Sequence, residues 1–393
     1  MFIVGVDVAK RSHEAIIIDR AGNIIKKAFN FKNDCAGFAK FLTALNSVSE
    51  NPSDFLIGME STSHYWLALY SNLQKLGYTV HVINPIQSNA LRGMYIRQIK
   101  TDEHDSFIIA EVIRFGRYTE GGLPPSRLYE LRELCRARSF IVDMNSDLKR
   151  KVIALLDQVF PEYEAFFTDM FGLSSSALLI NYSTPEEILS ADIEKIVELI
   201  AVPSRNRFRH AKATEIKNAA SNSFGIAFGS DTLGMLIKHH LTHIQYIESQ
   251  IEELDMKIAE IFAEFNTHLT TIPGIGPVLG ATIFSEIGDI SKFSSSAKLA
   301  AFAGIDPTIK QSGEFIATHN HMSKRGSPYL RRALWQAASC AVRSNPEMKV
   351  FFQRKRDEGK PYMNVIGHVT RKMTSIIYAV LRDGKPYYSN LST

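Results

Sequence analysis

The stretch that decides the fold is FIVGVDVAKRSHEAIIIDRAGNIIKKAFNF, residues 2–31. It contains three short apolar runs, at Phe2–Val8, Glu14–Asp19 and Ile24–Phe31, and the last two are joined by the turn residues Ala21-Gly22-Asn23. Apolar runs separated by turn residues predict strands. We therefore expect a three-stranded antiparallel meander at the start of the chain.

Helix and strand patterns alternate after this meander. A helical pattern over Phe38–Leu45 precedes a strand over Phe55–Met59, and a helix over Trp66–Leu76 precedes a strand over Tyr78–Ile83. A meander followed by β-α-β units predicts an RNase H-like α/β fold for residues 1–125. A doubly wound Rossmann-type domain is the alternative, but its sheet begins β-α-β rather than with a meander.

The pattern becomes helical from about residue 126. An apolar stripe runs from Leu128 to Leu155, and apolar residues recur every seven positions from Ile237 to Phe265. This heptad repeat predicts a long coiled-coil helix, used either for dimerisation or for packing within one chain. We expect three regions, 1–125, 126–265 and 266–393, of which the last is mainly α-helical.

The composition is that of an ordinary globular protein. The 393 residues are 45% apolar and 22% charged, and the three cysteines are too few and too widely spaced for a disulfide framework or a thiolate zinc site. No apolar run is long enough to span a membrane, and Met1 leads directly into a predicted strand rather than a signal peptide. We expect a soluble, cytoplasmic protein with reduced thiols and no membrane partner.

The charge is unevenly distributed along the chain. Residues 301–393 contain 15 Lys and Arg against 6 Asp and Glu, whereas the first 300 residues carry 30 against 35. A basic end on a mildly acidic body predicts a polyanionic partner, most commonly a nucleic acid.

Four acidic residues stand where a metal site is expected. Asp7 and Glu60 each end a predicted apolar strand, where a lone charge is costly to bury. Asp102 and Asp105 lie on one face at the start of a predicted helix. Four carboxylates in this arrangement suit two divalent cations, Mg²⁺ or Mn²⁺, of the kind used for phosphodiester displacement.

Each acid also has a simpler explanation. Asp7 can begin a turn, Asp102 can cap a helix together with Thr101, and Asp105 can interact with the helix dipole. The joint occurrence at two strand ends and one helical turn favours the metal site.

The basic end contains two segments suited to binding nucleic acid. Gly274 and Gly276, in Ile272-Pro273-Gly274-Ile275-Gly276, resemble a helix-hairpin-helix turn that brings backbone N–H groups to a phosphate, although a plain helix connection fits as well. A second group of basic residues surrounds a helix that Ser327-Pro328 begins, and a solvated helix face is its alternative. Its members are Lys324, Arg325, Arg331 and Arg332.

Taken together, these motifs resemble a known family. The matching N-terminal motifs are Gly5-Val6-Asp7-Val8-Ala9-Lys10, Met59-Glu60-Ser61-Thr62, Val82-Ile83-Asn84-Pro85 and Lys100-Thr101-Asp102-Glu103-His104-Asp105. The C-terminal motifs are Ile272-Pro273-Gly274-Ile275-Gly276, Ala300-Ala301-Phe302-Ala303-Gly304-Ile305, Gln311-Ser312-Gly313, Ser323-Lys324-Arg325-Gly326 and Leu330-Arg331-Arg332-Ala333-Leu334. In this order they resemble the transposases of the insertion-sequence family one-ten, to which the pilin-gene invertase is similar.

The resemblance implies a fold, an activity and partners. It implies an RuvC-like, RNase H-fold domain whose DEDD metal site is Asp7, Glu60, Asp102 and Asp105. It implies a C-terminal transposase domain whose nucleophile is Ser312, a residue that spacing alone places only in a tight turn beside Gly313. It also implies dimers that pair into tetramers, a structured noncoding bridge RNA that pairs with donor and target DNA, and a prokaryotic, nucleoid-associated location.

Three other functions compete with this interpretation. A metal-dependent junction-resolving endonuclease on the same fold uses water as nucleophile and leaves Ser312 a turn residue. A sugar-kinase or actin-like ATPase needs a glycine-rich phosphate loop after its first aspartate, and Val8-Ala9-Lys10-Arg11 does not provide one. A non-catalytic nucleic-acid-binding protein needs none of the four acids.

Overall fold

The chain forms two compact units, residues 1–124 and 125–393, and each is described by itself. The computed structural model describes residues 1–93, 101–116, 118, 122–307, 311–312, 315–316 and 321–389, with only the backbone of 311–312 and 315–316. No helix within these residues is both long and apolar enough to cross a membrane.

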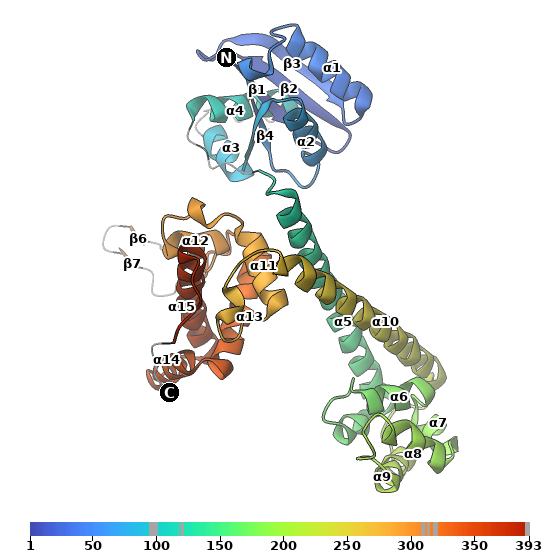
Figure 1. Cartoon of the computed structure of the whole chain (residues 1–393). Coiled ribbons are helices and arrows are strands. Elements are labelled where there is room, and N and C mark those ends of the chain that lie inside the picture. Colours follow the sequence, from blue (N-terminus) through green and yellow to red (C-terminus); the bar gives the residue numbers. More distant parts are fainter. Residues whose placement is uncertain are drawn as a thin grey trace. The chain divides into compact units, whose positions relative to one another are not determined.

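A five-stranded mixed sheet forms the centre of the N-terminal unit (Figure 1). Its strands are β1 (Phe2–Asp7), β2 (Ser12–Ile18), β3 (Ile24–Lys32), β4 (Phe55–Glu60) and β5 (Thr79–Ile83). Their order across the sheet is β3-β2-β1-β4-β5. The first three pair antiparallel, as the meander predicts, and β4 and β5 extend the sheet in parallel with β1. This is the expected outline of a meander followed by β-α-β units.

Helices cover both faces of this sheet. On one face, α1 (Cys35–Asn46) and α2 (Leu67–Lys75) pack against the strands through a buried cluster that includes Val4, Phe41 and Leu73. On the other face, α4 (Asp102–Phe115) packs on β1, β2 and β4, and α3 (Pro85–Arg92) lies beside α4. Because side chains alternate between faces along a strand, each strand contributes to both layers.

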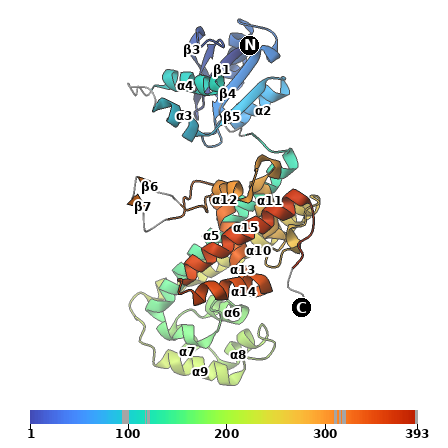
Figure 2. The same cartoon turned by 90° about the vertical axis from the view of Figure 1, so that its left-hand side faces the viewer.

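Two long helices, α5 (Ser126–Val159) and α10 (Ser230–Ala263), pack side by side in the C-terminal unit (Figures 1 and 2). Ion pairs join Arg138 to Asp255 and Lys149 to Glu248, so the two helices run antiparallel. Ile244 and Ile258 of the heptad repeat are buried within the chain. Part of the predicted coiled-coil stripe therefore packs intramolecularly.

Four shorter helices fold residues 173–221 against the far end of this pair. They are α6 (Leu173–Asn181), α7 (Pro185–Ser190), α8 (Ile193–Ala201) and α9 (His210–Ser221). Their apolar residues share one core with the ends of α5 and α10, including Leu156, Ile196 and Ile237.

The remaining helices form a separate core in the same unit. They are α11 (Pro277–Ile287), α12 (Ser296–Ala303), α13 (Pro328–Ser344), α14 (Pro346–Asp357) and α15 (Tyr362–Asp383). The Ser327 side chain accepts the N–H of Leu330, which confirms the predicted cap of α13. Two short antiparallel strands, β6 (Gln311–Ser312) and β7 (Phe315–Ile316), lie in the connection between α12 and α13.

Candidate active site

The alternation of side chains along β1 places Asp7 on the α4 face of the sheet. Val4 and Val6 point into the core beneath α1 and α2. Gly5 lies under α4, and Asp7, two residues later, ends the strand on that same face. The apolar run thus buries its valines on one side and presents a carboxylate on the other.

β4 repeats this arrangement one strand away. Ile57 and Met59 enter the core beneath α1 and α2, whereas Gly58 lies under α4 and Glu60 ends the strand. The parallel register pairs Gly5 with Gly58, so the ends of β1 and β4 lie at the same edge of the sheet.

The two glycines let α4 lie close to the sheet. A Cβ at Gly5 would be 2.0 Å from the carbonyl oxygen of Ser106, and one at Gly58 would be 2.3 Å from Cγ1 of Ile113. A Cβ at Gly5 would therefore displace the backbone of α4, and one at Gly58 would displace the side chain of Ile113. Sequence reasoning did not identify these glycines, although an isolated glycine inside a strand indicates a close backbone approach.

The first turn of α4 supplies the other two acids. Thr101 caps the helix by accepting the N–H of His104, and Asp102 and Asp105 follow within one turn. Asp102 is exposed, and Asp7, Glu60 and Asp105 are half-buried. The predicted helix is confirmed, and its N-cap is Thr101, with Asp102 as the first helical residue.

Electrostatics show that the four acids are neighbours. Burial, followed by the charges of Glu60, Asp105 and Asp102, raises the pKa of Asp7 from 3.8 to about 7, and the Arg92 guanidinium opposes the increase. A carboxyl group with so high a pKa among other carboxylates typically belongs to a functional site. The structure therefore brings together the acids that the sequence singled out.

Helix α3 supplies partners for two of these acids. Arg92 forms an ion pair with Asp105 at 2.7 Å, and its Nε is buried without a hydrogen-bond partner among the described residues. The hydroxyl of Ser88 donates to Glu60, and that of Thr62 donates to the same carboxylate at 3.4 Å. Sequence reasoning did not find Arg92 or Ser88, because helix α3 carries no pattern that relates it to the acids.

A fifth acid lies next to this cluster. Glu14 pairs with Asp7 across β1 and β2, and its neighbour Ile16 packs on the α4 side. Burial raises the pKa of Glu14, a hydrogen bond from Asn30 lowers it, and the charge of Asp102 raises it further. Neither its position nor its charge was singled out from the sequence.

The donor chemistry of this cluster fits a hard divalent cation. The cluster offers carboxylate oxygens, and the pKa of Asp7 is raised by burial first and then by the charges of the other three acids, which Arg92 only partly offsets. Across the residues that the structure describes, however, no three His, Cys, Asp or Glu side chains converge closely enough to hold one ion. Arg92 on Asp105 and Ser88 on Glu60 occupy oxygens that a cation would need.

Ser312 lies in the C-terminal unit, and its backbone pairs with Phe315 in the β6–β7 hairpin. Its side chain lies outside the described part of the chain. Gly274 has φ of 98°, and a Cβ there would be 2.8 Å from the backbone nitrogen of Ala341, so this glycine permits close packing on α13. Gly276, at the start of α11, has open space around it.

The four basic residues near α13 differ in their surroundings. Lys324 and Arg325 are exposed. Arg331 donates to the carbonyl of Ala303 at 3.3 Å, and Arg332 forms an ion pair with Asp143 of α5 at 2.7 Å. Lys324 and Arg325 are therefore the two that remain most available to a phosphate backbone.

A buried carboxylate fixes the segment that carries these residues. Glu286 of α11 is 5% exposed and accepts hydrogen bonds from Arg136 of α5 and from the hydroxyl of Ser327. Because Ser327 also caps α13, this one carboxylate connects three helices just after Lys324 and Arg325.

Protein-family models match both the N-terminal and the C-terminal part of the chain. Residues 4–161 match the DEDD transposase model of IS110 elements, described as a transposase. Residues 266–353 match the model of the transposase IS116/IS110/IS902 family. Together the two matches span more than half of the chain.

Individual relatives extend the similarity over nearly the whole length. The pilin gene-inverting protein of Moraxella bovis is 25% identical over 98% of this chain and 97% of its own. The IS116 uncharacterized 44.8 kDa protein of Streptomyces clavuligerus is 23% identical over 97% of this chain and 94% of its own. The transposase for IS1328 of Yersinia enterocolitica is 30% identical over 36% of this chain and 40% of its own. With both family models matched in order and the acids gathered at one sheet edge, the chain belongs to the IS110 family of DNA transposases and recombinases.

Proposed function

We propose that this transposase cuts and rejoins donor and target DNA through a covalent phosphoserine intermediate at Ser312, with divalent metal held by Asp7, Glu60, Asp102 and Asp105. The observation that carries the proposal is the gathering of the four acids at one sheet edge, where burial and then the charges of the other three raise the pKa of Asp7. We further propose that the N-terminal unit is an RuvC-like, RNase H-fold domain, which the strand order β3-β2-β1-β4-β5 supports.

The acids act by binding and positioning. Bound Mg²⁺ or Mn²⁺ would neutralise phosphate oxygens and favour ionisation of an attacking hydroxyl. Asp7 and Glu60 are fixed by their strands, and Asp102 and Asp105 by the capped start of α4. Arg92 forms an ion pair with Asp105, and a cation held by Asp105 would compete with this guanidinium for the carboxylate.

The bond changes at Ser312 balance without an external energy source. The serine hydroxyl loses its proton as Oγ forms a bond to phosphorus, one P–O bond of the DNA backbone breaks, and the leaving oxygen takes up a proton. The phosphodiester is conserved as a phosphoserine ester, so the hydroxyl of a new strand end can reverse the step and rejoin DNA.

We also propose the partners that the family resemblance implies. A structured bridge RNA base-pairs with donor and target DNA and thereby selects the sites, and the protein works as dimers that pair into tetramers. The exposed Lys324 and Arg325 contact the sugar-phosphate backbone of DNA or RNA, because they carry charge without an ion-pair partner among the described residues.

A plasmid recombination assay with the element's own flanking DNA tests this function. Asp102→Asn and Ser312→Ala are each expected to abolish recombination, whereas Asp19→Asn, which changes a half-buried acid in a turn of the same unit, is the control and keeps it. Full recombination by an Asp102→Asn, Asp105→Asn double variant would overturn the metal proposal. DNA cleavage to free ends that is lost with Asp102→Asn but kept with Ser312→Ala would show that water, as in a junction-resolving endonuclease, is the nucleophile.

A further inference from the structure

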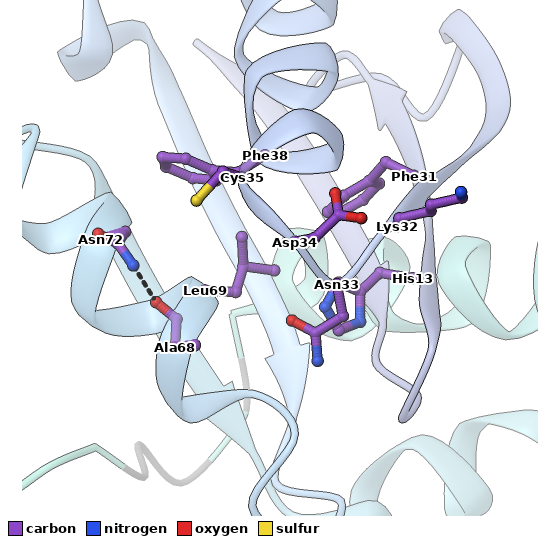
Figure 3. Close-up of a pocket in the computed structure, with 10 residues that line it drawn as sticks. All are labelled: His13, Phe31, Lys32, Asn33, Asp34, Cys35, Phe38, Ala68, Leu69 and Asn72. Carbon is purple, nitrogen blue, oxygen red and sulfur yellow. Dashed lines mark hydrogen bonds between the residues drawn. The ribbon is translucent and has the colours of Figure 1, made fainter.

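A small cavity of about 260 Å³ lies on the α1–α2 face of the N-terminal sheet (Figure 3). Its floor is formed by His13 and Phe31 of β2 and β3, and its sides by Phe38 of α1 and by Leu69 and Asn72 of α2. The proposed function does not use any of these residues.

The cavity lies at the same edge of the sheet as the four acids, on the opposite face. His13 precedes Glu14, which pairs with Asp7, and strand alternation sends His13 and Glu14 to opposite faces. The imidazole Nδ1 accepts the backbone N–H of Ala9 at 3.2 Å, two residues after Asp7. The same side chain therefore lines the cavity and holds the segment that follows Asp7.

His13 offers an unused hydrogen-bond donor in this cavity. Its side chain is 1% exposed, and burial lowers its pKa more than an interaction with the Asn33 side chain raises it, so the neutral ring is favoured. Because Nδ1 accepts from Ala9, the ring proton is on Nε2, which has no hydrogen-bond partner in the described part of the chain. A buried donor without a partner is costly, and a ligand that accepts from it removes that cost.

The other walls specify the kind of ligand. Phe31, Phe38 and Leu69 provide apolar surface for a flat ring. The Asn72 amide donates to the Ala68 carbonyl at 2.9 Å, as Figure 3 shows, which leaves its own oxygen free to accept. A cavity of about 150 Å³ holds benzene, so this one has room for a one- or two-ring heterocycle but not for a dinucleotide cofactor.

The entrance is mainly basic, with one carboxylate, Asp34, which lines the cavity and accepts the N–H of Gly37 at the start of α1. Lys32 lines the cavity and is exposed, and Lys10 and Arg11 are exposed on the segment that Asn33 anchors through hydrogen bonds to both of their carbonyls. None of the three cations forms an ion pair within the described residues. An apolar cavity with a polar end suits the base of a nucleotide, and cations at its entrance suit the phosphates, which stay outside.

We infer that this cavity binds one unpaired nucleobase of a nucleic-acid strand held at the acidic site. The ring packs against Phe31, Phe38 and Leu69 and accepts a hydrogen bond from His13 Nε2. This inference rests on the proposed function, because DNA processing at the acidic site is what brings a nucleic-acid strand to the cavity. The base comes from DNA or from RNA, and the same contacts serve both.

Photocrosslinking tests the inference with single strands of about 15 nucleotides containing 5-iodouracil, as DNA and as RNA. With the full-length protein, crosslinks are expected on Phe31, Phe38 or His13 by peptide mass spectrometry. Crosslinks from the DNA strand, the RNA strand or both support the cavity and identify the source of the base. Crosslinks found only outside the cavity overturn it.

Variants in helix α2 and at Leu76, the residue that follows it, test the cavity with a matched control. Ala68 is exposed and lines the cavity, so Ala68→Phe is expected to fill it and to reduce both crosslinking and strand affinity about tenfold. Leu76→Phe adds a ring at an exposed position outside the cavity and is expected to change neither. Asn72→Ala, also exposed, is expected to reduce the crosslink without affecting folding.

The result can be separated from failure of the proposed function. If Ala68→Phe crosslinks as strongly as the wild-type protein, the base-binding proposal is refuted, even if the recombination assay succeeds. Cavity crosslinks in a protein that does not recombine DNA would instead refute the proposed function and keep the base-binding site.

Discussion

Replacing Asp7 with Asn is expected to stabilise the metal-free N-terminal unit near pH 8 but not near pH 4. The pKa of this carboxyl is raised from 3.8 to about 7 by burial and by Glu60, Asp105 and Asp102. Below pH 3.8 the group is protonated in both the folded and the unfolded chain, so it carries no penalty. Between about pH 3.8 and 7 the unfolded chain loses the proton first, and the free energy of unfolding falls as the pH rises.

The size of the effect follows from this difference in pKa. Above pH 7 the full penalty would be about 4 kcal/mol, taking 1.36 kcal/mol for each pKa unit. Because Asp7 is partly exposed, solvent screening reduces this to about 2 kcal/mol. Asn keeps the shape of the side chain and removes the charge, so the variant regains this amount. Added Mg²⁺ is expected to abolish the advantage, since a cation neutralises the wild-type carboxylate.

The two tryptophans allow the N-terminal unit to be observed alone. Trp66 lies in that unit and Trp335 in the other, so a Trp335→Phe background reports denaturant unfolding of the N-terminal unit by fluorescence. The matched control is Asp19→Asn. Hydrogen bonds from Asn23 lower the pKa of Asp19, so its charge stabilises the fold above its ordinary pKa and its removal is expected to be unfavourable near pH 8. If Asp7→Asn destabilises the unit equally near pH 4 and pH 8 in chelator, the electrostatic argument is wrong.

Three further substitutions test the framework around the site. Gly5→Ala is expected to lower the free energy of unfolding by at least about 1–3 kcal/mol and to abolish recombination, because the added methyl group displaces α4. Gly276→Ala, in open space, is the control and is expected to leave unfolding unchanged. Equal melting temperatures for Gly5→Ala and the wild-type protein would contradict this. Arg92→Gln is expected to bind Mn²⁺ about tenfold more tightly, measured by calorimetry, because the substitution frees the Asp105 carboxylate. Weaker binding would show that Arg92 favours metal binding rather than competing with it. Glu286→Gln is expected to destabilise the C-terminal unit by about 2 kcal/mol, measured by Trp335 fluorescence during denaturant unfolding. An unchanged unfolding midpoint would show that Glu286 does not hold the three helices together.

The sequence predicted the N-terminal fold well because its elements are local. The apolar runs at Phe2–Val8 and Phe55–Met59 became β1 and β4, each with its acid at the end, and Thr101 caps α4 as its side chain allows. These features depend on residues close together in the chain, where period and capping determine the outcome.

The features that the sequence did not reveal depend on distant contacts. Ser88 and Arg92 reach the acids only because α3 lies beside α4, and no local pattern encodes that packing. Residues 172–230 have no clear period, yet Ile196 and Ile216 find a core with the ends of α5 and α10. The heptad repeat gave a long helix but left open whether its partner belongs to the same chain, and Ile244 is buried within this one.

The proposal that acids of one unit and a serine of the other process one phosphate is tested most directly by the covalent adduct. The protein would be incubated with DNA of the element's ends and target, the proposed guide RNA and Mg²⁺, then denatured and digested with nuclease and protease, and the peptides analysed by mass spectrometry. We predict a nucleotide joined through phosphate to Ser312, present with wild-type protein and absent with Asp102→Asn or with chelator. DNA ends cut without any attached serine, or an adduct that forms equally well with Asp102→Asn, would contradict the account.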